Sequence, residues 1–190
     1  MLPAGYLREG SIPSGPPTTI SSPHKLAALH SGICWALAGA GRCGGRRFEF
    51  ARPGSLYFGA AGGLGWGLPA AIGMQLGDPS RRVVALLGDG AVHYSVSGLW
   101  TAAQYNIPVV FVVARNSEYA ALKEFTRFMH VPDAPGMELP DMDIPGIAAS
   151  YGVQSQRVKS LADLTHAVKD ALSSDKPHLI EISQRRLADF

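Results

Sequence analysis

Apolar residues fall into short runs and helical repeats from residue 56 to the end of the chain. Uninterrupted apolar runs of strand length are typical of β-strands buried on both faces, whereas apolar positions three and four residues apart indicate helices. Because the predicted strands and helices alternate, the pattern predicts an α/β fold: a doubly wound parallel sheet flanked by helices, with right-handed crossovers. The predicted strands are 82–87, 108–114, 153–158 and 178–183, and the predicted helices are 68–76, 96–105, 119–129, 147–151 and 161–173.

Side-chain patterns within these segments predict which residues enter the core. In the helix at 96–105, the aromatic residues Trp100 and Tyr105 are expected to pack inward. The stretch 131–145 is expected to be a loop because of its prolines. The helix at 161–173 is amphipathic, and its apolar face carries Leu161, Leu164, Val168 and Leu172.

The first 51 residues differ in composition from the rest of the chain. Residues 1–23 are rich in Pro, Gly, Ser and Thr and have few apolar anchors, which is typical of a flexible tail. Residues 24–38 favour a short helix, which the glycine-rich stretch 39–47 would end. We therefore expect an atypical, poorly ordered N-terminal segment at 1–51 and one folded domain at 52–190.

Bulk composition narrows the class of protein. Of the 190 residues, 46% are apolar and 17% are charged, below the roughly 25% charged residues of a typical soluble domain. The net charge of +2 gives no support for binding to nucleic acid or to an anionic membrane. The longest apolar run, Val109 to Ala114, is far shorter than the roughly 20 residues of a membrane-spanning helix.

The cellular location is expected to be cytoplasmic. The N-terminus lacks the basic start and continuous apolar stretch of a signal peptide. The two cysteines, Cys34 and Cys43, make neither a disulfide framework nor a zinc site. Reduced thiols in the cytoplasm are the simplest interpretation of this cysteine content.

Two residues with metal-binding side chains follow two successive predicted strands. Asp89 closes the strand at 82–87, and Asn116 lies 27 residues later, just past the strand at 108–114. This spacing is close to the roughly 30 residues of a βαβ unit, so both side chains are expected at the carboxyl edge of the sheet, where ligands bind in open α/β folds. Carboxylate and amide oxygens suit Mg²⁺, which is commonly held by one or two carboxylates together with substrate phosphates. The spacing therefore predicts a metal–diphosphate site with Asp89 and Asn116 as metal ligands.

Glycines surround this predicted site. Gly88 and Gly90 flank Asp89 and leave room for a ligand to approach the backbone. The glycine-rich segments 59–67 and 88–95 each precede a predicted helix, whose free N–H groups can bind phosphate oxygens. A Gly-Asp-Gly alone is more typical of an ordinary turn, and a single glycine-rich loop of a tight connection. Their combination at the spacing of one crossover favours a binding site.

These motifs resemble those of the thiamine-diphosphate-dependent enzymes, whose metal-binding motif begins with Gly-Asp-Gly and ends with Asn after a crossover of this length. The resemblance covers roughly residues 53–183 and is closest to the benzoylformate decarboxylase branch. It implies the thiamine-diphosphate-binding fold, with thiamine diphosphate and Mg²⁺ as cofactors. The strings that carry it are YFGAAGGLGWGLPAAIG (57–73), GDGAVHYSVSGLWTAAQYNIP (88–108) and SEYAALKEF (117–125).

The resemblance implies a role for the residue at each matching position. Asp89 and Asn116 would bind the metal through their side chains, and Glu118 through its backbone carbonyl. Leu64 would support the bent shape of the cofactor, and Phe125 would line the substrate pocket. Plain core packing is the alternative explanation for Leu64, Tyr94 and Phe125. The remaining cofactor-binding positions are Gly62, Gly63, Gly88, Gly90, Ala91, Tyr94 and Tyr119.

The chain departs from the family pattern at two points. The family usually has Asn-Asn-Gly where this chain has Arg115-Asn116-Ser117, so a positive charge lies beside the metal site and a serine replaces a glycine that is expected to adopt an unusual backbone angle. The chain also resembles only the last of the three domains of full-length members. The glutamate that activates the cofactor and the catalytic histidines lie outside the matched region. We therefore expect no catalytic residue here, and a fragment that is active only with the missing domains.

The function implied is that of a thiamine diphosphate and Mg²⁺ binding domain from an enzyme that decarboxylates an aromatic 2-keto acid without oxidation. An acetolactate-synthase-type or oxalyl-CoA-decarboxylase-type enzyme is one alternative, and a non-enzymatic remnant that acts as a binding module is another. A nicotinamide-binding domain is disfavoured, because Gly63, Gly65 and Gly67 do not make the G-x-G-x-x-G motif. The expected partners are a small 2-keto acid and either further copies of the chain or the missing domains, with neither nucleic acid nor membrane.

Overall fold

The computed structural model of the chain describes residues 33–38, 54–59, 63–131 and 133–184. For Phe58 and for 33–38 the description is of the backbone. The predicted tail at 1–23 and the predicted cofactor contact Gly62 lie outside the described residues.

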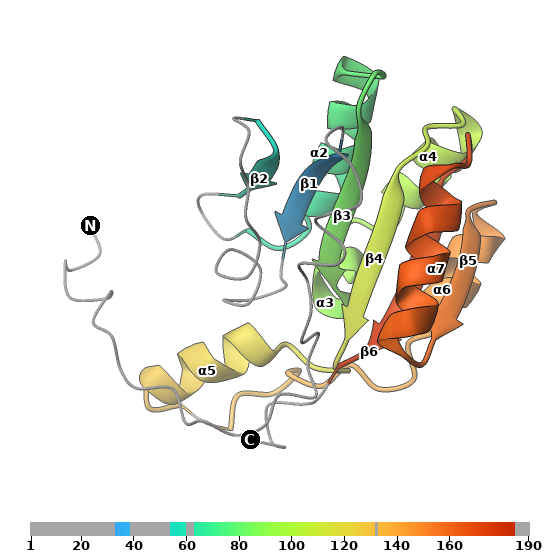
Figure 1. Cartoon of the computed structure of the whole chain (residues 1–190). Coiled ribbons are helices and arrows are strands. Elements are labelled where there is room, and N and C mark those ends of the chain that lie inside the picture. Colours follow the sequence, from blue (N-terminus) through green and yellow to red (C-terminus); the bar gives the residue numbers. More distant parts are fainter. Residues whose placement is uncertain (1–32, 39–53, 60–62, 132, 185–190) are drawn as a thin grey trace.

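Six strands form one parallel sheet in the order β2-β1-β3-β4-β6-β5 (Figure 1). The predicted α/β class with a parallel sheet flanked by helices is thereby confirmed. The strands are β1 (Ile33–Ala38), β2 (Leu56–Phe58), β3 (Arg82–Gly88), β4 (Val110–Arg115), β5 (Gln154–Val158) and β6 (His178–Ser183). The helices are α2 (Gly67–Gly77), α3 (Asp89–His93), α4 (Gly98–Gln104), α5 (Ala120–Phe128), α6 (Ile144–Ser150) and α7 (Leu161–Leu172).

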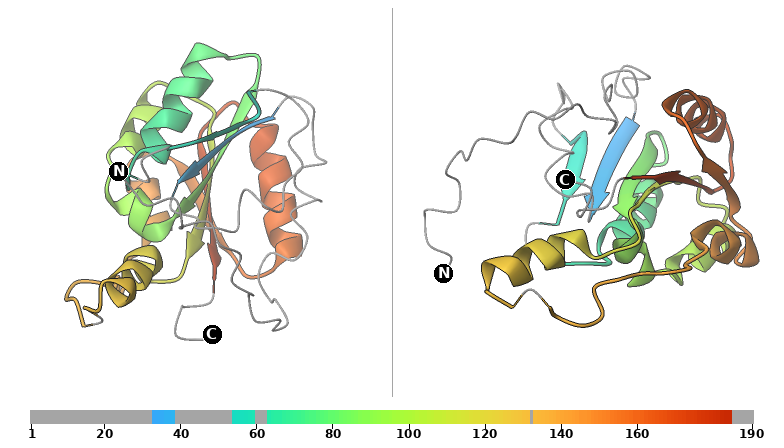
Figure 2. Two further views of the ribbon diagram at one scale, coloured as in Figure 1. Left: turned by 90° about the vertical axis from the view of Figure 1, so that its left-hand side faces the viewer. Right: turned by 90° about the horizontal axis from the view of Figure 1, so that it is seen from below.

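Helices cover both faces of the sheet, and each face has its own hydrophobic cluster (Figure 2). Alternate residues of β4 point to opposite faces, as a strand requires: Phe111 and Val113 join the cluster formed with α2, α4 and α6, and Val110 and Val112 join the cluster formed with α7. Helix α5 lies apart from both clusters, below the carboxyl edge of the sheet (Figure 1), and has no buried residue. The core therefore fixes the strands that reach this edge but leaves α5 on the surface.

The helix predicted at 24–38 is wrong where the chain is described, because 33–38 form strand β1. β1 pairs with β3 along its whole length and with β2 at three positions. These ladder hydrogen bonds outweigh a weak local preference for helix. β1 precedes the domain boundary expected at residue 52, and that boundary stays a prediction.

Two local expectations about helices also need correction, and one helix was not predicted. Trp100 and Tyr105 are not core residues, since they are 49% and 66% exposed; α4 is short and buries Leu99 and Ala102 instead. Helix α6 begins at Ile144, inside the predicted loop, because a proline in the first turn needs no intrahelical N–H. A separate short helix, α3, precedes α4 and was not predicted.

The apolar face predicted for α7 is buried at the centre of the helix but not at its first residue. Leu164 and Val168 are buried, whereas Leu161 is exposed.

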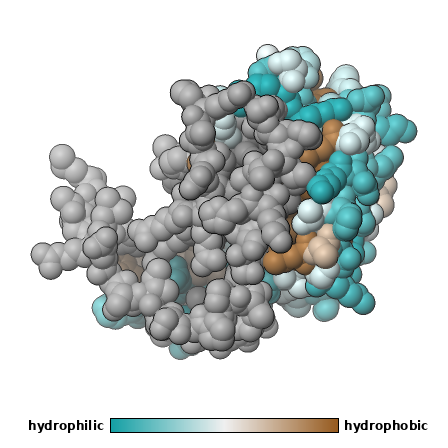
Figure 3. All heavy atoms as spheres, viewed as in Figure 1, coloured by the Kyte–Doolittle hydropathy of each residue, from teal (hydrophilic) through white to brown (hydrophobic). Residues whose placement is uncertain are grey.

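On the side shown in Figure 3, hydrophilic residues cover much of the coloured surface, and hydrophobic residues reach it near the middle. Among the described residues, no helix is long and apolar enough to cross a membrane.

His178, at the start of β6, is partly buried. Its Nε2 atom is buried and has no hydrogen-bond partner among the described residues. Burial lowers the pKa of His178 below its ordinary value of 6.5, and the negative charge of Asp170 on α7 offsets part of this effect. Protonation of this ring therefore costs more in the folded state than in the unfolded state.

We predict that this ring makes the fold less stable at acid pH. A pKa that is lowered by folding means that the unfolded state binds more protons as the pH falls through the ordinary value, so the free energy of unfolding decreases. Urea unfolding at about pH 7.5 and about pH 5 should show a smaller decrease for His178→Gln than for the wild type. His166→Gln, at an exposed position of α7, is the matched control. Equal decreases in the wild type and in His178→Gln would contradict the prediction.

Candidate functional site

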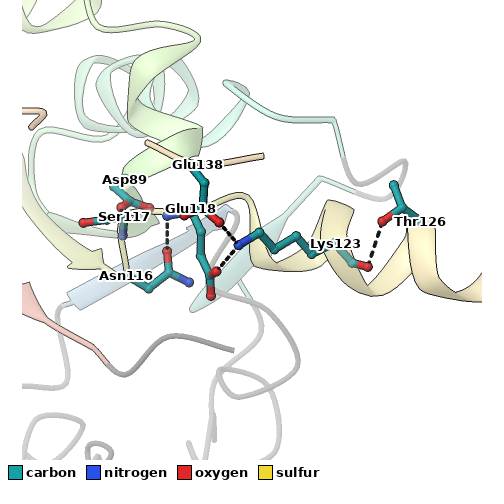
Figure 4. A network of polar contacts seen from close by, with 7 residues as sticks. All are labelled: Asp89, Asn116, Ser117, Glu118, Lys123, Thr126 and Glu138. Atoms are coloured by element: carbon teal, nitrogen blue, oxygen red, sulfur yellow. Dashed lines mark hydrogen bonds and ion pairs between the residues drawn. The ribbon is translucent and has the colours of Figure 1, made fainter. Parts of the chain in front are cut away.

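The carboxyl ends of β3 and β4 bring Asp89 and Asn116 to one edge of the sheet. Gly88, the last residue of β3, is paired with Ala114 of β4. Asp89 follows β3 directly, and Asn116 follows Arg115, the last residue of β4. Figure 4 shows the two side chains near one another, Asp89 at the start of α3 and Asn116 after β4, which is the arrangement that the βαβ spacing predicts.

Asp89 is the first residue of α3 and is 3% exposed. Its Oδ1 accepts a hydrogen bond from the N–H of Gly90 at 2.9 Å, and its Oδ2 accepts one from the N–H of Ser117 at 2.7 Å. Burial raises the pKa of Asp89 above its ordinary value, while hydrogen bonds from the backbone of Ser117, Gly90 and Asn116 and the charge of Arg115 act in the opposite direction. A bound cation would further favour the ionised carboxylate.

Asn116 and Glu118 complete the predicted set of metal ligands. Asn116 Oδ1 accepts a hydrogen bond from the N–H of Glu118 at 3.2 Å, and Glu118 is buried. No group of three His, Cys, Asp or Glu residues among those described could hold a metal ion. The predicted set instead offers one carboxylate, one amide and one backbone carbonyl. Such hard oxygen ligands suit Mg²⁺ when a bound phosphate supplies further oxygens.

Ser117, between these two residues, has a left-handed backbone with φ of 58°. The unusual angle expected at this position is therefore confirmed. The conformation costs a residue with a side chain roughly 1–2 kcal/mol. Two hydrogen bonds hold it: the N–H of Ser117 donates to Asp89, and its carbonyl accepts the N–H of Leu139 at 2.9 Å. Strain of this kind persists where the surroundings over-determine the backbone.

Two tyrosines join the segments around Asp89. A side chain at Gly90 would come within 2.5 Å of the ring of Tyr119, so the space that Gly90 leaves is filled by this ring. The rings of Tyr119 and Tyr94 meet edge to face, with centroids 6.1 Å apart. Gly65, with φ of 86°, approaches Tyr94 so closely that a Cβ atom would lie 2.8 Å from that of the tyrosine. The loop before α2, the end of α3 and the start of α5 are thus in contact.

The other residues predicted to bind the cofactor or substrate differ in exposure. Ala91 is buried within α3, Gly63 is exposed with open space at its Cβ position, and Leu64 is half-buried. Core packing does not explain Tyr94 and Phe125, which are 59% and 53% exposed.

Sequence reasoning missed the polar contacts of Lys123 on α5. Its ammonium group forms ion pairs with Glu118, at 2.5 Å, and with Glu138 (Figure 4). Glu118 and Lys123 are five residues apart, which is not a helical spacing, and Glu138 lies in a segment predicted as loop. No pattern in the sequence therefore pointed to these pairs.

A cavity of about 610 Å³ lies between α5 and the following loop. None of the predicted metal or cofactor ligands among the described residues lines it, but Lys123 and Glu138, whose ion pairs reach the predicted metal ligand Glu118, do, so the cavity adjoins the predicted site. Its lining residues are Lys123, Arg127, Ala134, Pro135, Gly136, Met137, Glu138 and Pro140.

Comparison with known proteins gives three informative similarities in sequence. The chain matches the family model of the thiamine pyrophosphate enzyme, C-terminal TPP binding domain, over residues 39–182. It is 47% identical over 137 residues to benzoylformate decarboxylase from Pseudomonas aeruginosa, a match that covers 72% of this chain and 26% of that protein. It is 31% identical over 124 residues to the mitochondrial acetolactate synthase catalytic subunit from Aspergillus candidus, covering 65% of this chain and 18% of that protein.

The fold is similar to a solved structure, the thiamine diphosphate-dependent 4-hydroxybenzoylformate decarboxylase from Rhodococcus jostii. The TM-score is 0.80 with 36% sequence identity, and the match covers 98% of this chain and 36% of that chain. The chain thus spans about a quarter of the length of the Pseudomonas protein and about a third of the Rhodococcus chain.

We predict that Ser117→Gly raises the free energy of unfolding by up to about 1.5 kcal/mol. Glycine removes a left-handed strain of roughly 1–2 kcal/mol, and its larger entropy in the unfolded state offsets about 0.5–1 kcal/mol. Urea unfolding of both proteins measures the difference. Ser97→Gly, at a position with φ of −61°, should instead lower stability. A loss of stability in Ser117→Gly as large as that in Ser97→Gly would show that Ser117 is not strained.

Proposed function

Since the chain belongs to the thiamine pyrophosphate enzymes, as the C-terminal domain that binds thiamine pyrophosphate (thiamine diphosphate), we propose that it serves a benzoylformate-decarboxylase-like enzyme that decarboxylates an aromatic 2-keto acid. Family membership confirms the resemblance predicted from the sequence. The 47% identity to the benzoylformate decarboxylase from Pseudomonas aeruginosa supports the proposed reaction, and the hydrogen bond from Ser117 to Asp89, which joins the segments that follow two neighbouring strands, supports the metal site.

In this proposal Asp89 and Asn116 bind Mg²⁺ through their side-chain oxygens, and Glu118 binds it through its backbone carbonyl. The buried carboxylate of Asp89, whose pKa is raised by burial, gains the compensating charge that a buried anion needs. When bound, thiamine diphosphate supplies the nucleophilic carbon and the electron sink that decarboxylation of a 2-keto acid needs. The work of this chain is to anchor and orient the diphosphate end.

The remaining cofactor contacts are proposed from their places around this edge. The half-buried Leu64 and the exposed Gly63 precede α2, and Leu64 would support the bent cofactor. Phe125, exposed on α5, would line the substrate pocket. The residues proposed to contact the cofactor around Asp89 are Gly88, Gly90, Ala91, Tyr94 and Tyr119, and Gly62 is proposed from the sequence alone.

Association with the rest of an enzyme is part of the proposal. Exposed aromatic residues stand in the segments around the carboxyl edge of the sheet: Trp66 before α2, Tyr94 after α3, and Phe125 and Phe128 on α5. Large contiguous patches of exposed apolar groups mark interaction surfaces, and we propose that these residues contribute to one. Either a second copy of the chain or the domains that carry the catalytic Glu and His would cover them. A cytoplasmic location is proposed from the composition and cysteine content.

An acetolactate-synthase-type activity is the second candidate, supported by the 31% identity to the Aspergillus candidus subunit. An oxalyl-CoA-decarboxylase-type enzyme and a non-enzymatic binding module are two further candidate functions. In a protein that joins the chain to the other domains of a family member, product analysis with benzoylformate and with pyruvate separates the enzyme types. Loss of CO₂ from benzoylformate without carbon–carbon joining is the result that our proposal expects.

We predict that the chain binds thiamine diphosphate in the presence of Mg²⁺ and that Asp89→Asn weakens this binding at least about 100-fold. The substitution keeps the shape of the side chain but removes the charge that the cation requires. Isothermal titration calorimetry with and without a chelator measures the effect. Asp175→Asn, whose side chain is 97% exposed in an ion pair with Arg82, is the matched control. Binding that is equally tight in excess chelator, or unchanged in Asp89→Asn, would contradict the proposed metal site. If the wild type gives no heat of binding, a non-enzymatic module is favoured instead.

A further inference from the structure

The segment after Asn116 is held in place by a second segment of the chain, residues 137–139. The N–H of Tyr119 donates to the carbonyl of Met137 at 2.9 Å, and the N–H of Leu139 donates to the carbonyl of Ser117 at 2.9 Å. These two bonds flank an antiparallel bridge between Glu118 and Glu138. The backbone of Glu118 is thus tied to Asp89 through Ser117 on one side and to 137–139 on the other.

Lys123 joins the side chains of the two bridged residues. Its Nζ pairs with Glu118 Oε2 at 2.5 Å and with Glu138 Oε1 (Figure 4). The side chain of Glu118 is 1% exposed, that of Lys123 is 19% exposed and that of Glu138 is 54% exposed. The contact with Glu118 is therefore almost completely shielded from water, whereas the contact with Glu138 is at the surface.

Charge explains why this arrangement constrains the backbone. Two glutamates that face each other across a bridge repel, as like charges do on paired strands. A cation between them offsets this repulsion, and a buried carboxylate that loses its cation is strongly destabilised. Lys123 is itself fixed by α5, where its N–H donates to the carbonyl of Tyr119 at 2.9 Å. The ammonium group therefore favours one relative position of Glu118, Glu138 and the start of α5.

We propose that Lys123 is a positioning residue for the metal site: by pairing with Glu118 and Glu138, it fixes the direction of the Glu118 backbone carbonyl toward the cation. This inference rests on the proposed function, in which that carbonyl is a metal ligand. Residues that orient metal ligands typically contribute 10–100-fold to metal affinity. The sequence contains no spacing that would have indicated the role.

The difference between Mg²⁺ and Ca²⁺ tests the proposal. Mg²⁺ demands near-ideal octahedral geometry, whereas Ca²⁺ accepts more variable geometry. In titrations of the full chain at a fixed concentration of thiamine diphosphate, Lys123→Met should weaken the binding of Mg²⁺ about tenfold or more but that of Ca²⁺ only about two- to threefold. Lys123→Arg, which keeps the charge, should restore most of the Mg²⁺ affinity. Lys159→Met, at an exposed position away from the site, should match the wild type.

Equal losses for the two ions, or no loss for either, would overturn the proposal, because a variant that is merely less folded loses affinity for both ions alike. If Lys123→Met does not fold, Glu138→Gln replaces it, since this surface side chain can be changed without exposing the buried Glu118. That variant should lower the Mg²⁺ to Ca²⁺ affinity ratio about two- to threefold, and an unchanged ratio would overturn the inference. A wild-type chain that binds neither ion with thiamine diphosphate refutes the proposed function and the inference together, whereas normal wild-type binding with insensitive variants refutes the inference alone.

Discussion

The hydrogen bond from the N–H of Ser117 to the carboxylate of Asp89 connects the two halves of the site. The two residues are 28 positions apart in the sequence, and the distance from the nitrogen of Ser117 to Oδ2 of Asp89 is 2.7 Å. This hydrogen bond exists because β3 and β4 are adjacent and parallel, so their carboxyl ends meet. It also requires a left-handed backbone at Ser117, a conformation that most residues avoid. Loss of this contact would separate the buried carboxylate from the segment that carries Asn116 and Glu118.

Two kinds of contact hold the site in place. Apolar packing fixes the ends of β3 and β4, whereas polar contacts hold the segments that follow β4. The residues of β3 and β4 that face either cluster are buried, which fixes where the two loops begin. After β3, helix α3 is still buried, whereas α5, which follows β4, has no buried residue. Position there depends instead on the bridge between Glu118 and Glu138 and on Lys123. A site built in this way can be disturbed locally while the sheet remains folded.

Much of the fold and part of the site could be predicted from the sequence. Uniform apolar runs and helical periodicity identified β3, β4, β6 and α7, because burial on two faces and on one face leave different patterns. The βαβ spacing placed Asp89 and Asn116 at one edge, because the geometry of a crossover is nearly constant. Strand β1 was mistaken for a helix, because its conformation depends on pairing with β3. The exposure of Trp100 was missed, because α4 is too short to show which face is buried. The contact of Lys123 with Glu138 depends on the segment 137–139 packing beside Glu118, which the local sequence does not encode.

The central claim is that Asp89, Asn116 and the carbonyl of Glu118 bind one cation that anchors a diphosphate. A crystal structure of the chain grown with thiamine diphosphate and Mn²⁺, in place of Mg²⁺, tests this directly through the anomalous scattering of the metal. The account predicts one strong anomalous peak at coordination distance from the two side chains and the carbonyl, with diphosphate oxygens completing the octahedron. A diphosphate bound at this edge without a metal peak, or a peak coordinated by other residues, would contradict it.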